Sequence, residues 1–519
     1  MPTAVWLLAL CVFAVSINSS SLTSVSDAIE YLNVAHSVVL SGEPLVSIEG
    51  VQIPPRNFPL FSFAFVAPFQ YLFGTQPLTG VFGCIAILIL GIFLLSRFAG
   101  AIGGEKALLL CAMALLLLSE TRYFGVQPLV DCSFAVLGLT LVGIAAQASH
   151  HREFSLQDAI LFGVLSFSLV GLRLTGVFFV LPVFFVLISL RRMKSRAFLV
   201  ALGSTFLAGA AQLAYSASVF GSPFRTGYNY WVPIPYDNFW LVFNPKYFVP
   251  NLVELFSQSS FVGLLLVFSV LLSLARNNEQ VRENLRKIRP FLLVSLVPLG
   301  CLVLFHLFYF YFSSRFFIPV YYVLCVGCAV LAAPLFTISD LEFRKGFLYL
   351  AVLGAAVTLL FDKGPSEFDQ AVRVLQSSGG GYTVITDKNP LLASLVYPKA
   401  RAVWVVDRSQ EYASKAVAEI SMAAFASTVS DWKSVTFEDL VAHGAKPVVK
   451  NVFVERREDF REIVQREGTV VFLGTPPAGF LASVREMGIS VSRYRPELFL
   501  LTIPTSKKGE LSLLDLNKA

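Results

Sequence analysis

Long apolar runs separated by short polar loops recur from residue 3 to residue 361. Runs of about 20 apolar residues match the helix length that crosses the hydrocarbon core of a bilayer. The pattern predicts a polytopic α-helical membrane protein with about 11 transmembrane helices. The first run has no basic segment before it, so we expect an uncleaved span there. The expected spans are residues 3–22, 78–98, 105–119, 128–147, 156–171, 174–190, 197–219, 259–275, 291–312, 316–336 and 346–361.

One further apolar stretch, residues 58–74, is shorter and opens on Phe58-Pro59. We expect it to form an interfacial helix in the first outer loop. With a cytoplasmic N-terminus, the loops inside the cell then hold most of the loop Lys and Arg, as the positive-inside rule requires. If 58–74 crossed the membrane, this bias would invert. An N-terminus outside the cell would restore the bias, but it would place the loop at residues 23–57 in the cytoplasm.

The pattern changes after residue 361, where short apolar runs of strand length alternate with helix-like segments. This alternation predicts a small α/β domain. We therefore divide the chain into a transmembrane domain, residues 1–361, and an extracytoplasmic domain, residues 362–519. The expected strands are residues 382–387, 402–407, 447–454, 469–473 and 498–503.

Composition agrees with a membrane protein. Of the 519 residues, 55% are hydrophobic and 14% are charged, whereas a soluble protein carries about 25% charged residues. The net charge of +6 reflects loop residues that set orientation, so it does not predict a nucleic-acid partner. The five histidines are scattered and form no metal-binding triad. No cofactor is predicted with certainty, and a divalent cation is left open.

Asp27 stands at the head of the first outer loop, residues 23–57, directly after the first apolar run. The pattern over residues 26–40 predicts a helix, which places Asp27 in its first turn. An acid there either stabilises the helix N-terminus or acts as a general base on an acceptor hydroxyl at the membrane surface.

Asp131 follows Pro128 at the predicted outer end of the fourth span. A carboxylate at mid-bilayer costs about 2.5–3.5 kcal/mol on insertion scales, and less near the interface. Such an acid is retained either for a role at a substrate or as the partner of a loop cation such as Arg122.

Three arginines are predicted near the same outer surface. Arg173 lies in the tight turn Gly171–Gly176, and with Arg225 and Arg315 it can surround a lipid phosphate, whose oxygens match a guanidinium. The alternative is that these side chains extend to lipid headgroups. Arg225 opens a long outer loop, residues 220–258, whose many aromatic residues include Tyr228. These aromatics form either an interfacial belt or a surface that stacks on a sugar.

Several motifs resemble those of a known family in order and spacing. They are Asp27-x3-Tyr31-x3-Ala35, Ser41-Gly42-Glu43-Pro44, Arg56-Asn57-Phe58-Pro59-Leu60, Leu72-Phe73-Gly74, the run Phe220–Tyr228, and Ser314-Arg315-Phe316-Phe317-Ile318-Pro319. Together, over roughly residues 1–336, they resemble the dolichyl-phosphate-mannose mannosyltransferase (PMT-like, glycosyltransferase family 39) superfamily, which includes bacterial aminoarabinose transferases.

The resemblance implies a GT-C fold and transfer of a sugar from a polyprenyl-phosphate donor at the outer face of the cytoplasmic membrane. The acceptor would be a hydroxyl of a glycan, lipid or protein. Asp27 would be the general base, and the implied substrate-binding residues are Arg56, Asp131, Arg173, Arg225, Tyr228 and Arg315.

The chain departs from the family pattern at two places. Ala28 stands where many members have Glu, and Asn57-Phe58 stand where many have Glu-Lys. A metal site that uses the Glu is therefore in doubt, and Arg56 becomes the nearest candidate for the donor phosphate. Two rival functions stay open: a transporter or lipid-linked saccharide flippase, and a scaffold that acts through its C-terminal domain.

Overall fold

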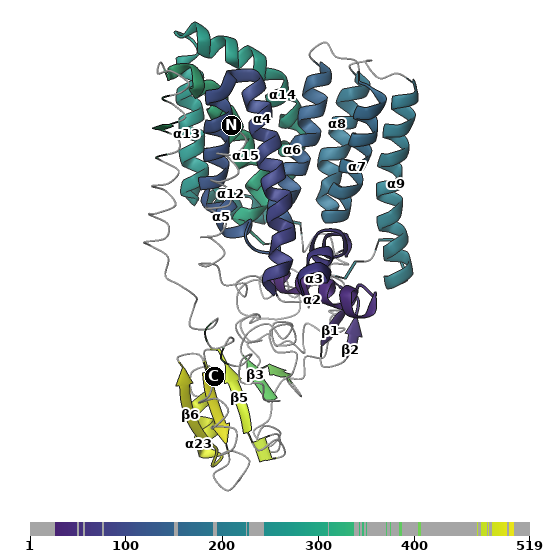
Figure 1. Ribbon diagram of the computed structural model, residues 1–519, viewed down its shortest axis with the longest axis vertical. Helices are drawn as coiled ribbons and strands as arrows, with labels where there is room; N and C mark the ends of the chain where they lie inside the picture. The colour runs from purple at the N-terminus through teal and green to yellow at the C-terminus, as the bar shows by residue number, and fades with distance from the viewer. Residues whose placement is uncertain are drawn as a thin grey trace.

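The computed structural model combines a helical bundle with a small mixed sheet (Figure 1). The residues that it describes are 26–48, 51–55, 58–74, 77–149, 154–189, 195–224, 226–227, 243–309, 311–336, 342, 345–346, 349, 370, 374, 383–386, 403–405, 464–465, 469–474, 476, 480–495 and 498–502.

With α4 counted once, five described helical segments are long and apolar enough to cross a membrane, and a pair bent by 74° makes up to six. The prediction of a polytopic helical membrane protein is confirmed, while the full number of spans stays a prediction. The long elements are α4 (Pro77–Leu117), α6 (Val130–Ser149), α9 (Ser195–Phe220), α14 (Glu279–Leu307) and α15 (Ile318–Ala332), with η4 (Ser314–Phe317) and η5 (Ala333–Leu335) flanking α15. The bent pair is η3 (Pro245–Tyr247) with α12 (Phe248–Ser257), followed by α13 (Ser259–Leu274). The shorter helices are α5 (Ser119–Phe124), α7 (Leu156–Leu172), η2 (Leu174–Gly176) and α8 (Val177–Ser189).

The element α4 is a hairpin of two helices, not one rod. Gly104 adopts φ 78° and ψ −170°, a conformation that favours glycine because a side chain would be strained there. In a continuous helix Gly100 and Leu108 would lie about 12 Å apart. A Cβ placed on Gly100 would instead lie 2.9 Å from Cβ of Leu108. The chain therefore reverses, in agreement with the two spans predicted at 78–98 and 105–119.

Helix α14 begins earlier than the predicted span at residues 291–312. The side chain of Asn278 caps its N-terminus by accepting a hydrogen bond from the backbone N–H of Val281, at 3.1 Å. Val281 and Ile288 are fully buried. The charged residues 279–290, which the sequence predicts in an inner loop, therefore form additional turns of α14. They do so because the apolar side of this stretch packs against the bundle.

The segment before α4 is a folded layer on the bundle. It contains α2 (Ser26–Ser41), the antiparallel pair β1 (Val46–Ile48) and β2 (Val51–Ile53), and the helical segment η1 (Ser62–Val66) with α3 (Ala67–Phe73). Five residues of η1 and seven of α3 rise about 18 Å, which is short of the ~30 Å hydrocarbon core. The segment 58–74 is thus too short to be a span of its own. The hydroxyl of Ser62 donates to the carbonyl of Tyr31 at 2.8 Å, which ties this segment to α2.

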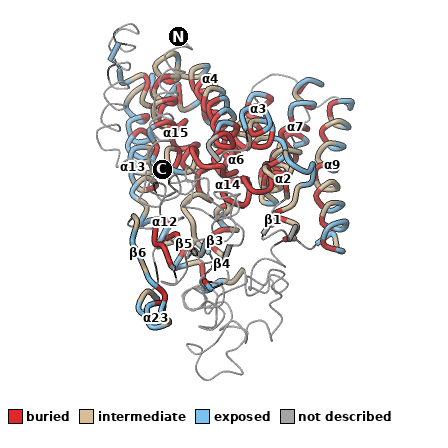
Figure 2. The backbone as a smooth tube through the Cα atoms, turned by 60° about the horizontal axis from the view of Figure 1, so that its bottom comes forward, coloured by how far each residue is buried: buried red, intermediate tan, exposed pale blue. Residues whose placement is uncertain are grey.

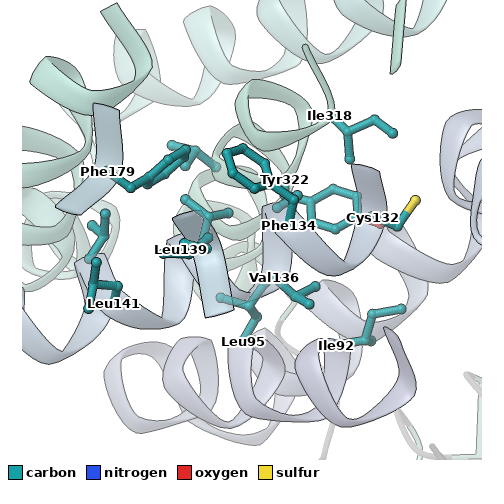
Figure 3. Close-up of a cluster of buried hydrophobic side chains, with 14 of the residues drawn as sticks. Ile92, Leu95, Cys132, Phe134, Val136, Leu139, Leu141, Phe179, Ile318 and Tyr322 are labelled. Atoms are coloured by element: carbon teal, nitrogen blue, oxygen red, sulfur yellow. The ribbon is translucent and has the colours of Figure 1, made fainter. Parts of the chain in front are cut away.

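The core lies where α15 passes between α4, α6, α13 and α14. Almost every residue of α15 is buried, including the fully buried rings of Tyr321 and Tyr322, and Figure 2 shows α15 and α6 largely in the colour of buried residues. In Figure 3, Ile92 of α4, Phe134 of α6 and Phe179 of α8 converge in one apolar cluster. A helix buried on all sides holds the residues at its ends in fixed positions.

Close approach between α4 and α6 gives a stability prediction. A Cβ on Gly91 would lie 2.3 Å from Cβ of Val136, so Gly91→Ala forces the helices apart. We expect a loss of about 1–3 kcal/mol in the free energy of unfolding, as for overpacked cores. A Cβ added to Gly300 of α14 would meet no described atom within 4 Å, so Gly300→Ala is the matched control and should be neutral or slightly stabilising. Denaturant titration in detergent compares the two, and equal stabilities would contradict the packing.

The described part of the C-terminal sheet has five strands in the order β4-β3-β5-β7-β6. The first three are parallel neighbours, and β7 runs antiparallel to both β5 and β6. The predicted strands at 382–387, 402–407, 469–473 and 498–503 are present, the sequence missed β6, and 447–454 lies outside the described residues. Figure 1 shows the sheet beyond the end of the bundle that carries α2, β1 and β2. The described elements are β3 (Thr383–Thr386), β4 (Val403–Val405), β5 (Thr469–Leu473), α23 (Phe480–Glu486), β6 (Ser490–Arg495) and β7 (Leu498–Thr502).

Candidate active site

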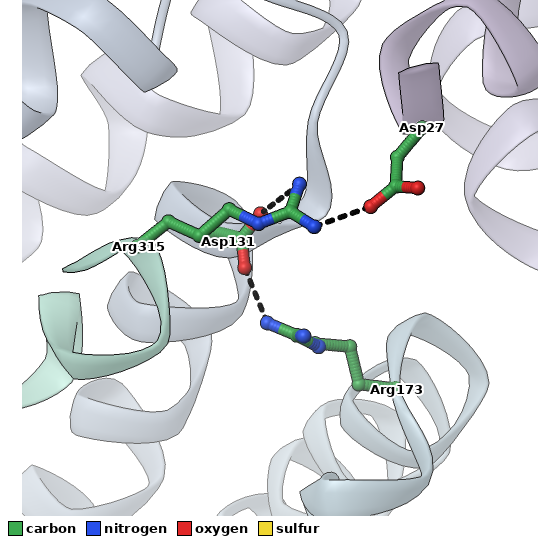
Figure 4. A network of polar contacts seen from close by, with 4 residues as sticks. All are labelled: Asp27, Asp131, Arg173 and Arg315. Carbon is green, nitrogen blue, oxygen red and sulfur yellow. Dashed lines mark hydrogen bonds and ion pairs between the residues drawn. The ribbon is translucent and has the colours of Figure 1, made fainter. Parts of the chain in front are cut away.

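Four charged side chains from four distant segments meet at one end of the bundle (Figure 4). Asp27 lies in the first turn of α2 and Asp131 in the first turn of α6. Arg173 lies at the junction of α7 and η2, and Arg315 lies in η4, just before α15. Each is held by a helix end, so none needs to sit at mid-depth of an apolar helix.

The turn that carries Arg173 is unusually tight. Arg173 ends α7 with its backbone N–H donating to the carbonyl of Leu169 at 3.0 Å, and its own carbonyl accepts from the N–H of Gly176 at 2.8 Å. A Cβ on Gly176 would lie 2.5 Å from the carbonyl carbon and oxygen of Leu169, so only glycine fits. The turn thereby fixes the backbone from which the Arg173 side chain extends to α6.

Arg315 joins the two acids. Its Nη2 donates to Oδ2 of Asp27, and its Nη1 lies 3.8 Å from Oδ2 of Asp131. Arg173 donates from Nη1 to the other oxygen of Asp131, Oδ1. Figure 4 shows the resulting chain of contacts, Asp27 to Arg315 to Asp131 to Arg173. Asp131 is therefore the shared partner of both guanidiniums.

The four side chains differ in how far they are exposed to solvent. The exposed fraction is 2% for Asp131, 11% for Arg315, 17% for Asp27 and 21% for Arg173. An ion taken out of water costs several kcal/mol unless a partner and hydrogen bonds compensate it. Two carboxylates and two guanidiniums leave the cluster without net charge. The buried carboxylate of Asp131 is thus compensated by two guanidiniums, whereas Asp27 and Arg173 are partly exposed at the two ends of the cluster.

An aromatic residue lies beneath both arginines. The guanidinium carbon of Arg173 is 4.8 Å from the ring centroid of Phe316, and that of Arg315 is 5.3 Å away, within the range of cation–π attraction. The ring of His306 stacks on Phe316 with centroids 4.3 Å apart. The sequence motif that contains Arg315 also contains Phe316, but nothing in the sequence assigned this ring to the arginines.

His306 gives a second stability prediction. It is 3% exposed, and within the described part of the chain neither ring nitrogen has a hydrogen-bond partner. A buried unpaired polar group costs about 1–3 kcal/mol. His306→Phe keeps the stacking on Phe316 and removes the unpaired nitrogens, so we expect the melting temperature in detergent to stay equal or rise. A lower melting temperature would show that the imidazole nitrogens stabilise the fold.

The structure brings together four of the seven residues that the sequence singled out: Asp27, Asp131, Arg173 and Arg315. Arg56, Arg225 and Tyr228 lie outside the described residues, so their roles stay predictions. The partners of Asp131 are Arg173 and Arg315, which answers the question of which cation it faces. In the part of the chain that the structure describes, no three His, Cys, Asp or Glu side chains gather as metal ligands would.

Comparisons with known proteins identify the fold. No family model and no curated protein matches the sequence. Among solved structures, the crystal structure of ArnT from Cupriavidus metallidurans bound to undecaprenyl phosphate matches with a TM-score of 0.57 and 14% identity, over 97% of this chain and 98% of that one. The apo structure of ArnT gives the same TM-score at 13% identity, over 97% of each chain.

A chain of helices with a small C-terminal sheet, aligned over nearly its whole length with ArnT, has the fold of ArnT, the GT-C fold. The predicted fold class is therefore confirmed. At 13–14% identity the likeness concerns the fold.

Proposed function

We propose that the protein is an integral membrane glycosyltransferase that moves a sugar from a polyprenyl-phosphate donor to an acceptor hydroxyl. The observation that carries this proposal is the cluster in which Asp27 contacts Arg315 and Asp131 joins Arg315 to Arg173 at one end of the bundle. In this cluster Asp27 supplies a base for a hydroxyl, and the two guanidiniums supply a binding site for a phosphate. The GT-C fold supports the proposal, because ArnT with this fold binds undecaprenyl phosphate.

The transfer needs one base and one leaving group. Asp27 takes the proton of the acceptor hydroxyl while the oxygen attacks the anomeric carbon. The bond between that carbon and the phosphate oxygen breaks, and polyprenyl phosphate leaves with the bonding pair. Arg315 and Arg173 offset the negative charge that develops on this phosphate, and such preorganised charge stabilises the transition state most in a dry site.

The distribution of charge speaks against the rival transporter. A transporter or flippase requires polar groups on its path near mid-depth of the membrane. Among the described helices, α8, α13 and α15 contain no Asp, Glu, Lys or Arg, and α6 has only Asp131, in its first turn. The buried network lies at the helix ends, as a surface enzyme requires. We therefore favour transfer at the outer face of the cytoplasmic membrane, with the C-terminal domain on the same side.

The proposal is tested with the full-length protein in vesicles that contain a polyprenyl-phosphate sugar labelled in the sugar. Envelope lipid, glycan and protein fractions are supplied as acceptors. We expect the label to move to one fraction while polyprenyl phosphate accumulates in equal amount. Label that crosses the vesicle membrane but stays on the polyprenyl donor would instead establish the flippase.

A further inference from the structure

The carboxylate of Asp27, the proposed base, is paired with Arg315 in this structure. Oδ2 of Asp27 accepts a hydrogen bond from Nη2 of Arg315. Before this oxygen can receive a proton from an acceptor hydroxyl, the guanidinium has to release it. Arg315 is also a proposed ligand of the donor phosphate, and its Nη2 lies at the Asp27 end of the cluster. The same nitrogen therefore has two candidate anions.

Asp131 and Asp27 differ in how readily each can separate from Arg315. Asp131 is almost fully buried and binds Arg173 through its other oxygen. If Asp131 moved away, two guanidiniums would lose the anion that compensates them. Asp27 is more exposed and stands at the start of α2, in the segment that packs on the end of the bundle. An anion that enters from the outer face thus competes with Asp27 and not with Asp131.

We propose that the donor phosphate displaces Asp27 from Arg315, and that Asp27 displaces the product phosphate in turn. Asp131 is then a positioning residue that keeps both arginines in place during the exchange. The exchange rests on the proposed glycosyl transfer and adds to it a coupling: Arg315 releases the base only when the donor is bound. An acceptor hydroxyl that arrives alone meets a carboxylate that is still paired.

Charges balance through the cycle. The donor is a phosphodiester with one negative charge, so donor, two acids and two arginines sum to −1. In the transfer the acceptor proton moves to Asp27, and the released monoester carries one more negative charge than the diester, so the sum stays −1. When Asp27 then loses its proton to water, a second anion competes for Arg315. Re-ionisation of Asp27 therefore favours release of polyprenyl phosphate.

Binding of undecaprenyl phosphate to the full-length protein in nanodiscs of zwitterionic lipid tests the exchange. Asp27→Asn removes the competing anion, so we expect the dissociation constant of this lipid to fall about tenfold. Glu43→Gln is the matched control, because Glu43 is an exposed acid of the same loop, beyond the C-terminal end of α2. Glu43→Gln should leave the constant unchanged. Undecaprenol, which lacks the phosphate, should bind all forms equally.

A double variant separates exchange from simple charge repulsion. If Asp27 acts through Arg315, then Asp27→Asn gives no gain in an Arg315→Gln background. A gain that persists in that background, or unchanged or weaker binding in the single Asp27→Asn variant, would overturn the exchange while leaving glycosyl transfer intact. Failure of the wild-type protein to bind undecaprenyl phosphate at all would overturn the proposed function together with the exchange.

Discussion

Asp27→Asn is expected to lower the rate of sugar transfer by roughly 10²–10⁴-fold, the usual contribution of a positioned general base. Asparagine has nearly the same shape and can still accept a hydrogen bond from Arg315, but it cannot take the proton of an acceptor hydroxyl. Arg315 also keeps Asp131 at 3.8 Å, so the cluster retains an anion at its centre. We expect the variant to be abundant, folded and inactive.

The measurement is donor turnover in vesicles with protein amount and melting temperature recorded in parallel. Glu43→Gln should transfer sugar at the wild-type rate. Activity of Asp27→Asn within a few fold of wild type would remove the base assignment. If Asp27 only stabilises the N-terminus of α2, the opposite result is expected: a modest loss of stability with activity retained.

The sequence predicted the ends of the elements better than the contacts between them. Asp27, Asp131 and Arg315 could each be placed at the end of a helix, because apolar runs stop at polar residues when a bilayer is the solvent. The break between the spans predicted at 78–98 and 105–119 likewise matches the reversal within α4.

The pairing within the site could not be predicted from the sequence. Asp27 and Arg315 are 288 positions apart, and only the packing of α2 and α15 against shared neighbours brings them together. The central place of Asp131 depends on the same packing, and so does the contact of Phe316 with both arginines. Pairing between side chains at helix ends leaves no periodicity in a single chain.

Strand β6 shows a different limit. Ser490–Arg495 reads SVSRYR, with few of the apolar positions that identify a buried strand. Among the described strands it lies at the edge of the sheet, next to β7, and edge strands tolerate charged side chains, which also discourage pairing with other chains. A hydrophobic pattern therefore identifies central strands such as β5 and misses an edge strand of this composition.

Asp131→Asn is expected to have the largest effect on stability. It leaves the guanidiniums of Arg173 and Arg315 beside a neutral amide, and breaking a buried ion pair in this way costs about 3–5 kcal/mol. Because Arg173 is 21% exposed and can be partly rehydrated, we expect a value at the lower end. Transfer should fall as well, since both proposed phosphate ligands lose the group that positions them.

A double-variant cycle tests whether the loss arises from the network. Arg173→Gln removes one of the two cations that Asp131→Asn leaves unpaired, so the double variant should lose less stability than the sum of the single variants. We expect the difference to be about 1–3 kcal/mol, as for residues in one buried network. Unfolding in detergent mixtures measures all four forms. If the two losses in the free energy of unfolding simply added, Asp131 and Arg173 would act independently. The buried centre of the site would then have to lie elsewhere.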